Sequence, residues 1–350
     1  MHQASFPTTP VRGGLARGPW TRATLLVWGG IALFIAAVLA SAIGLREFLA
    51  AGRGTALLTV PLGVEGQLTL QVRERAAPSY LLSLTEGLEQ PMAVAASSDG
   101  STYVADGACR CVRVFDERGR LLTTLGPEVR GGELQYPVAL ALDEGGILYV
   151  SDLAEGHIHR FQKGAYLGPL LTGDIPSSVT APAGLLIQHG LLYVNDLSRH
   201  QVLVFNLEDG ALVRVVGAGK GRGVGELAYP NFSLVLADGA LLVADSNNNR
   251  LQLFGPRGDV RTQWEGHVSA PRGLARDGDG NIHVASTMAG RIEVFTPRGD
   301  YLGGYGELAG GPGKLGFPTG IAITSETLYV ADRGNGRVLI GRLPGKGGAR

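Results

Sequence analysis

One five-residue pattern occurs six times along this chain of 350 residues and constrains its fold more than any other feature. In each copy a short apolar run ends on an aspartate, except that the fifth copy ends on a serine. The copies are TYVAD at 102–106, LYVSD at 148–152, LYVND at 192–196, LLVAD at 241–245, IHVAS at 282–286 and LYVAD at 328–332. A period of roughly 20 to 50 residues indicates a repeat architecture, in which each repeat is one supersecondary unit.

Each copy belongs to a longer unit that opens with a proline. The opening prolines lie 41 to 48 residues apart and are Pro91, Pro137, Pro182, Pro230, Pro271 and Pro318. Within each of the first five units, turns separate four apolar runs rich in Val, Leu, Ile and Tyr. The runs have the length and composition of β-strands. Four antiparallel strands per unit, repeated six times, predict an all-β fold, a six-bladed β-propeller.

The two ends of the repeat region predict how the ring closes. The sixth unit lacks a fourth apolar run, because PGKGGAR at 344–350 follows its third and is expected to be a flexible tail. The segment PSYLLSLT at 78–85 precedes the first unit and resembles GRLLTTLG at 119–126, the fourth run of that unit. We therefore expect residues 78–85 to complete the sixth blade, so that residues 78–343 form one closed ring without exposed sheet edges.

The aspartate that ends the repeated pattern is predicted to be structural. It falls where the second strand of each blade turns into the third, and in units four to six an arginine stands five residues after the pattern ends. A carboxylate there can accept backbone N–H bonds from the turn or pair with the arginine. An active site needs one acid, whereas a scaffold needs one in each blade. The predicted structural acids are Asp106, Asp152, Asp196, Asp245 and Asp332, with Ser286 in the fifth unit.

The unit resembles the NHL repeat. That repeat combines Pro-x-Gly-apolar-Ala, a YVAD segment, Asn-x-Arg and a glycine-rich loop, and LLVADSNNNRLQLFGPRGD at 241–259 follows it closely. LYVADRGNGRVLI at 328–340 and the glycine-rich loops at 217–230 and 306–318 also fit. The resemblance covers residues 78–343 and implies a propeller of the NHL or TolB-like type. NHL propellers hold protein partners or, in some members, RNA, so the resemblance indicates fold more than function.

The segment 23–45 predicts a membrane anchor. Its 23 uncharged residues would span roughly 34 Å as a helix, against a hydrocarbon core of about 30 Å. Three arginines and no acid precede it, which places residues 1–22 in the cytoplasm and the propeller outside it. We predict a single-pass signal-anchor, with a cleaved signal peptide ending near ASA at 40–42 as the alternative. Residues 46–77 are expected to form a juxtamembrane stalk or a small hairpin.

Charge and cysteine content limit the partners. The 31 basic and 31 acidic residues balance, and the dense basic and aromatic surface of an RNA-binding protein is missing, so no nucleic-acid partner is predicted. Cys109 and Cys111 are expected to be two small half-buried residues, because a bridge between residues two apart is usually strained. A redox or metal role is the alternative for this pair.

The turns between second and third strands share one face of the predicted propeller with the loops between blades. We call this the loop face. It is mildly more basic than the opposite face, and we predict that it binds a protein or cell-envelope partner. Solvated charges without a partner are the alternative. The candidate binding residues are Arg110, Arg199, Lys220, Arg222, Arg250, Arg291 and Arg337.

A metal-dependent lyase or hydrolase in the propeller channel is the alternative function, since some six-bladed propellers that this chain resembles are such enzymes. A metal site needs several histidine or carboxylate ligands that converge from different blades. The candidate ligands are His157, His200 and His283. The pair His157 and His159 has no third ligand at a convincing spacing. We therefore predict a non-catalytic binding propeller with no cofactor and no metal.

Overall fold

The computed structural model describes residues 55–61, 67–73, 77–126, 131–170, 179–308 and 313–344. The predicted membrane segment at 23–45, the residues before it and the tail at 345–350 lie outside the described residues. Within the described part of the chain, no helix has the length and apolar character that a membrane span requires. Of two compact units, Met1–Ala56 is almost wholly undescribed, and Leu57–Arg350 contains the propeller.

Two strands fall within the segment where a stalk or hairpin was expected. They are β1 (Thr55–Pro61) and β2 (Gln67–Arg73). The two strands pair with each other in a sheet of their own.

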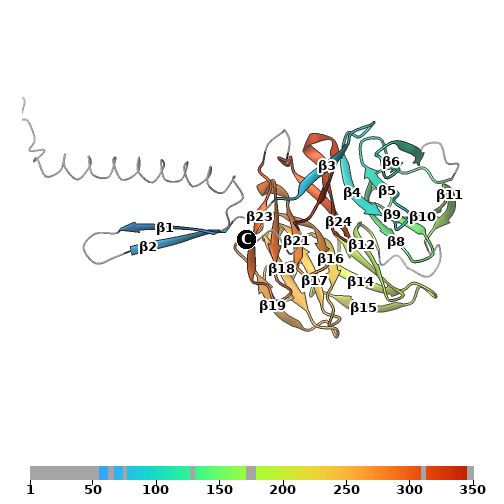
Figure 1. Cartoon of the computed structure of the whole chain (residues 1–350). Helices are drawn as coiled ribbons and strands as arrows, with labels where there is room; N and C mark the ends of the chain where they lie inside the picture. Colours follow the sequence, from blue (N-terminus) through green and yellow to red (C-terminus); the bar gives the residue numbers. More distant parts are fainter. Residues whose placement is uncertain are drawn as a thin grey trace, which may run out of the picture. The chain divides into compact units, whose positions relative to one another are not determined.

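The first three repeat units form three four-stranded antiparallel sheets, each with its strands in sequence order (Figure 1). Each sheet is one blade of a propeller, as predicted. Blade one consists of β4 (Pro91–Ala96), β5 (Thr102–Asp106), β6 (Cys111–Phe115) and β7 (Leu121–Leu125). Blade two consists of β8 (Pro137–Leu142), β9 (Ile147–Asp152), β10 (His157–Gln162) and β11 (Ala165–Pro169). Blade three consists of β12 (Pro182–Gln188), β13 (Leu191–Asp196), β14 (Gln201–Asn206) and β15 (Leu212–Val216).

The last three blades carry a short 3-10 helix between their second and third strands. Blade four consists of β16 (Pro230–Val235), β17 (Leu241–Asp245), η1 (Ser246–Asn248), β18 (Arg250–Phe254) and β19 (Val260–Trp264). Blade five consists of β20 (Pro271–Arg276), β21 (Ile282–Ser286), η2 (Thr287–Ala289), β22 (Arg291–Phe295) and β23 (Tyr301–Tyr305). Blade six consists of β24 (Pro318–Thr324), β25 (Thr327–Asp332), η3 (Arg333–Asn335), β26 (Arg337–Arg342) and β3 (Ser79–Leu84).

The ring closes through β3, the strand that precedes blade one in the sequence. It pairs antiparallel with β26, with Leu84 opposite Val338, and so supplies the outer strand of blade six. Leu84 is 1% exposed and packs with Val104 and Phe115 of blade one. Both ends of the propeller therefore meet in one blade, which confirms the predicted closure and the count of six.

The register explains why each unit opens with a proline. Every opening proline is the first residue of its strand and lies opposite the last residue of the repeated pattern, as Pro91 does opposite Asp106 and Pro318 opposite Asp332. Proline is tolerated at the first residue of a strand, where no ladder hydrogen bond is lost.

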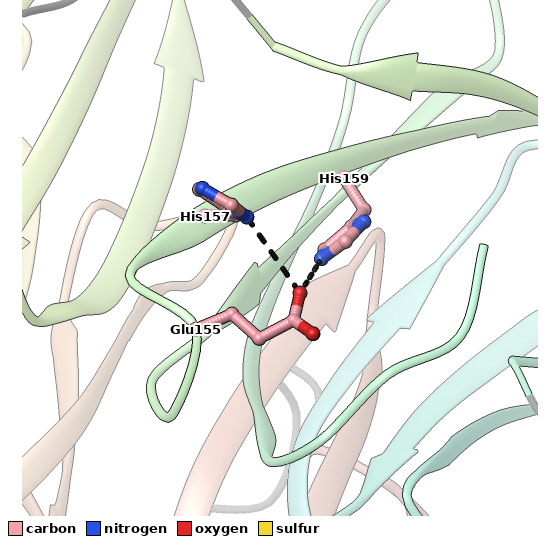
Figure 2. Close-up of side chains that lie close together, drawn as sticks. All are labelled: Glu155, His157 and His159. Atoms are coloured by element: carbon pink, nitrogen blue, oxygen red, sulfur yellow. Dashed lines mark ion pairs between the residues drawn. The ribbon is translucent and has the colours of Figure 1, made fainter. Parts of the chain in front are cut away.

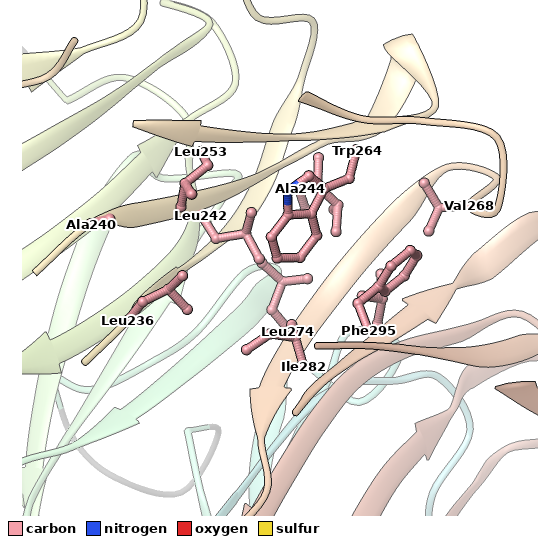
Figure 3. Close-up of a cluster of buried hydrophobic side chains, with 12 residues drawn as sticks. Leu236, Ala240, Leu242, Ala244, Leu253, Trp264, Val268, Leu274, Ile282 and Phe295 are labelled. Atoms are coloured by element: carbon pink, nitrogen blue, oxygen red, sulfur yellow. The ribbon is translucent and has the colours of Figure 1, made fainter. Parts of the chain in front are cut away.

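The hydrophobic core lies between neighbouring blades. The second strands are the most deeply buried, and all five residues of β17 and of β21 are buried, so both faces of these strands pack against neighbours. Figure 3 shows the layer between blades four and five, where Leu242, Leu253 and Trp264 meet Leu274 and Phe295. Such layers, repeated around the ring, replace the single core of a sandwich.

The prediction for the two cysteines was wrong. Cys109 and Cys111 form a disulfide, and no described cysteine is free. Their Cα atoms are 5.3 Å apart, within the range of about 4.4–6.8 Å in which a bridge forms. The reason is local: Arg110, the residue between them, adopts the left-handed conformation with φ of 57°. The tight turn folds the two cysteines toward each other.

Candidate functional site

A cavity of about 380 Å³ lies at the centre of the ring, lined by residues from all six blades. Its wall repeats with the blades, because the residue after each opening proline faces it. These residues are Met92, Val138, Ala183, Asn231, Arg272 and Thr319. First strands begin at the loop face, so the cavity lies at that end of the channel. A concave site of this size accommodates a small ligand or a side chain of a partner.

The walls of the cavity are mainly apolar. Leu153 and Leu197, which follow repeat acids, line it together with Phe232. Two tyrosines also line the cavity. Tyr136 is half-buried, and Tyr229 is 39% exposed. Among the described residues that line the cavity there is no histidine, aspartate or glutamate. The lining therefore offers neither a set of metal ligands nor an acid to balance a positive charge.

Two arginines of neighbouring blades face this cavity. Arg272 lies on β20 of blade five, and Arg333 begins η3 of blade six. Neither guanidinium group makes an ion pair or a hydrogen bond with the described residues, and the Nε atom of Arg272 is buried without a partner. Burial lowers the pKa of Arg272, and the positive charge of Arg333 lowers it further, while Tyr136 opposes this.

This pair of arginines gives the cavity a positive charge that an anion could balance. Arginine remains protonated in proteins, so two like charges share a partly buried space with no described counter-ion. Buried charges are normally paired, because an unpaired charge loses its hydration. A carboxylate or phosphate entering the cavity would remove the repulsion and could accept two N–H bonds from each guanidinium fork.

The repeat acids bind the loop that leads into their own blade. Asp152, fully buried, accepts the backbone N–H groups of Gln135 and Tyr136 and also those of Ala154 and Glu155 in the following turn. Asp106 and Asp196 accept backbone N–H groups in the same pattern. The contacts are those that a structural role requires, since each acid ties a loop to a turn.

In blades four and six the acid also binds the arginine five residues later. Arg250 Nε donates to Asp245 Oδ2 over 2.7 Å, and Arg337 Nε donates to Asp332 Oδ2 over 2.8 Å. Arg250 is 6% exposed and also donates to backbone carbonyls of the glycine-rich loop. Arg250 therefore ties the glycine-rich loop to the repeat acid, and little of its side chain is open to solvent. Arg337 likewise donates to the carbonyl of Lys314.

Other predicted binding residues differ in how accessible they are. Blade five has Ser286 in place of the repeat acid, so Arg291 has no such acid to bind. It donates instead to Glu293 and to the carbonyl of Gly306. Arg110 is exposed and donates to Gln135 across 3.3 Å. The remaining three are exposed: Arg199, Lys220 and Arg222.

The structure does not bring the three predicted histidines together. His200 is buried and accepts the backbone N–H of Tyr229 at Nδ1. His283, 1% exposed, lies between Tyr305 and Asp277, both within hydrogen-bond distance of its ring. His157 lies beside Glu155 and His159 in blade two (Figure 2).

The cavity arginines escaped prediction for a structural reason. Arg333 lies on the predicted loop face. Arg272 belongs to a first strand, and the prediction of binding residues considered only turns and loops. A signal was present in the alignment of the units: the residue after each proline is apolar or small in three units, asparagine or threonine in two, and arginine only after Pro271. Reading that single position down the six units would have singled out Arg272.

The chain is similar in fold to several solved propellers. A streptogramin B lyase structure has a TM-score of 0.53 at 17% identity, covering 84% of this chain and 89% of that one. A catalytically inactive virginiamycin B lyase from Staphylococcus aureus with quinupristin has a TM-score of 0.53 at 18% identity, covering 77% and 88%. A Bacteroides thetaiotaomicron protein of unknown function has a TM-score of 0.59 at 14% identity, covering 83% and 82%.

These likenesses show the fold alone, because the identities are low. No protein-family model and no curated protein sequence matches the chain. The class established by fold and topology is therefore a six-bladed β-propeller, and the narrower NHL assignment remains an interpretation of the repeat.

Proposed function

We propose that this protein is a membrane-anchored, extracytoplasmic binding propeller. Its loop face holds a protein or cell-envelope partner, and the central cavity receives an anionic group of that partner. The observation that carries the proposal is the pair Arg272 and Arg333, two cations that face one cavity without a described acid. The anchor rests on the uncharged segment at 23–45 and the arginines before it.

The shape of the cavity supports binding of an acid with an apolar body. The two guanidinium groups supply charge and geometry for a carboxylate or phosphate, and apolar residues such as Leu153 and Leu197 supply contact area. Tyr229, partly exposed among the lining residues, adds an amphipathic surface of the kind enriched at interfaces. Exposed Lys220 and Arg222 extend the positive charge across the surrounding loops.

The alternative, a metal-dependent lyase or hydrolase, has less support from the same cavity. Such an enzyme needs ligands that converge on the channel, and the described lining residues include no histidine and no carboxylate. The lyases with a similar fold do not transfer their activity to this chain at 17% and 18% identity.

A photo-crosslinking experiment tests the proposal. The photoreactive amino acid p-benzoylphenylalanine is placed at position 229, which lines the cavity and is exposed to solvent. The full chain is irradiated in intact membranes, and adducts are compared with those of the double variant Arg272→Gln, Arg333→Gln. We expect an adduct that the double variant loses.

The matched control is Arg257→Gln, which removes an exposed arginine from a turn on the opposite face. This variant should keep the adduct. No adduct at position 229, or an adduct that persists in the double variant, would remove the cavity from the binding function. Thermal unfolding of each variant shows whether an adduct was lost because the propeller unfolded.

A further inference from the structure

Blade two carries a cluster of two histidines and one glutamate that takes no part in the central cavity. Glu155 lies in the turn between β9 and β10, and His157 and His159 follow on β10. Residues two apart on a strand point to the same face, so both imidazole rings lie on one side of the blade. Figure 2 shows the three side chains converging.

The distances within the cluster suit one metal ion. Glu155 Oε2 lies 3.2 Å from His159 Nε2 and 3.6 Å from His157 Nδ1. The three ligand atoms all lie within 4.8 Å of one another. A tetrahedral Zn²⁺ with bonds of about 2.0–2.2 Å holds neighbouring ligand atoms roughly 3.3–3.6 Å apart. The two shorter separations already match that geometry.

The ring of His159 is held in a form that suits a metal ligand. Its side chain is 5% exposed, and its Nδ1 atom lies 3.1 Å from the hydroxyl of Tyr166. With the proton on Nδ1, the ring donates to this hydroxyl and turns an unprotonated Nε2 toward Glu155. A partner on the far ring nitrogen fixes metal-binding histidines in this way. Tyr166 is itself packed against Phe161, which is buried.

A second observation also indicates that this cluster binds a cation. The Nε2 atom of His159 is buried, and no hydrogen bond satisfies it within the described part of the chain. Glu155 is close enough, but its oxygen does not lie in hydrogen-bonding geometry. With the proton on Nδ1, a buried Nε2 without a hydrogen bond has a lone pair available for a cation.

We propose that Glu155, His157 and His159 bind one Zn²⁺ ion, with a water molecule as the fourth ligand. Two imidazoles and one carboxylate are a typical zinc ligand set, whereas Mg²⁺ and Ca²⁺ prefer oxygen ligands throughout. The side chains of His157 and Glu155 are 61% and 32% exposed, so an ion reaches the site from solvent. The site is separate from the cavity arginines, and either can fail without the other.

Zinc binding is tested on the full chain, purified in detergent without a histidine tag and freed of metal with a chelator. After equilibrium dialysis against Zn²⁺, elemental mass spectrometry should find one ion per chain, and thermal unfolding should shift upward. With Co²⁺ instead, the visible spectrum should show the intense bands of four-coordinate cobalt.

Two histidine variants form a matched pair. His157→Asn removes an exposed ligand and should weaken Zn²⁺ binding by about tenfold or more. His189→Asn removes an exposed histidine elsewhere on the propeller and should bind as the unaltered protein does. Glu155→Gln should also weaken binding. Absence of Zn²⁺ from the unaltered chain, or equal binding by all variants, would overturn the proposal.

Discussion

The carboxylate of Asp196 accepts the backbone N–H of Thr180 over 2.7 Å, which ties the end of one strand to the loop that leads into the same blade. The same carboxylate accepts the N–H groups of Ala181, Ser198 and Arg199. One buried acid therefore accepts hydrogen bonds from four backbone N–H groups that lie outside the paired strands. Because the arrangement recurs around the ring, each repeat acid contributes to the rigidity of the loop face.

Replacing Asp196 with asparagine should destabilise the propeller. The amide cannot accept on both of its terminal atoms, so at least one buried N–H group is left unpaired, at about 1–3 kcal/mol of unfolding free energy. The measurement is chemical denaturation of Asp196→Asn beside Glu144→Gln, which alters an exposed acid in a turn. Equal midpoints for the two variants would contradict the structural role of the acid.

The closing strand β3 offers a second test of stability. Leu84 is 1% exposed in the layer between blades six and one, whereas Leu81 on the same strand is 68% exposed. Leu84→Ala should lower the unfolding free energy by about 2–5 kcal/mol through a cavity in the core. Leu81→Ala should change it by less than about 0.5 kcal/mol. A small effect of Leu84→Ala on the denaturation midpoint would show that the ring does not depend on this closure.

The sequence predicts the ring better than the site. Six units and their strands follow from local patterns, because a strand, a turn and the acid opposite a proline lie within one unit. The closure follows from the missing fourth run of the sixth unit and the extra run at 78–85. The cavity has no such local pattern: Arg272 and Arg333 meet only because the ring brings blades five and six side by side. The disulfide was missed for a related reason, since its feasibility depends on the left-handed conformation of Arg110.

Asp277 should make the stability of blade five depend on pH. Burial alone would raise the pKa of Asp277, but hydrogen bonds from His283 and Asn281 outweigh it and hold this pKa below its usual range. In the unfolded chain the pKa of an aspartate is about 3.9. Below about pH 4, unfolding is therefore accompanied by protonation of Asp277. The stabilisation is complete above about pH 4 and is lost as the pH falls through the folded pKa.

The comparison with Asp277→Asn isolates this contribution. The variant lacks the titrating carboxylate, so its unfolding free energy should fall less steeply than that of the unaltered protein below about pH 4. Urea denaturation at a series of pH values between neutral and strongly acidic conditions measures both slopes. Parallel slopes would show that Asp277 does not hold a depressed pKa in the folded chain.

The disulfide between Cys109 and Cys111 connects the fold to the proposed compartment. Disulfides persist outside the reducing cytoplasm, so a chain whose propeller faces outward should carry this bridge in the cell. Intact cells are treated with a membrane-permeant alkylating reagent near neutral pH before lysis, because the thiolate is the reactive form, and the peptide containing both cysteines is then weighed by mass spectrometry. We expect no alkylation before reduction and two alkyl groups after it. Two alkyl groups without reduction would place the propeller in a reducing compartment, and the orientation inferred from the arginines before residue 23 would then be wrong.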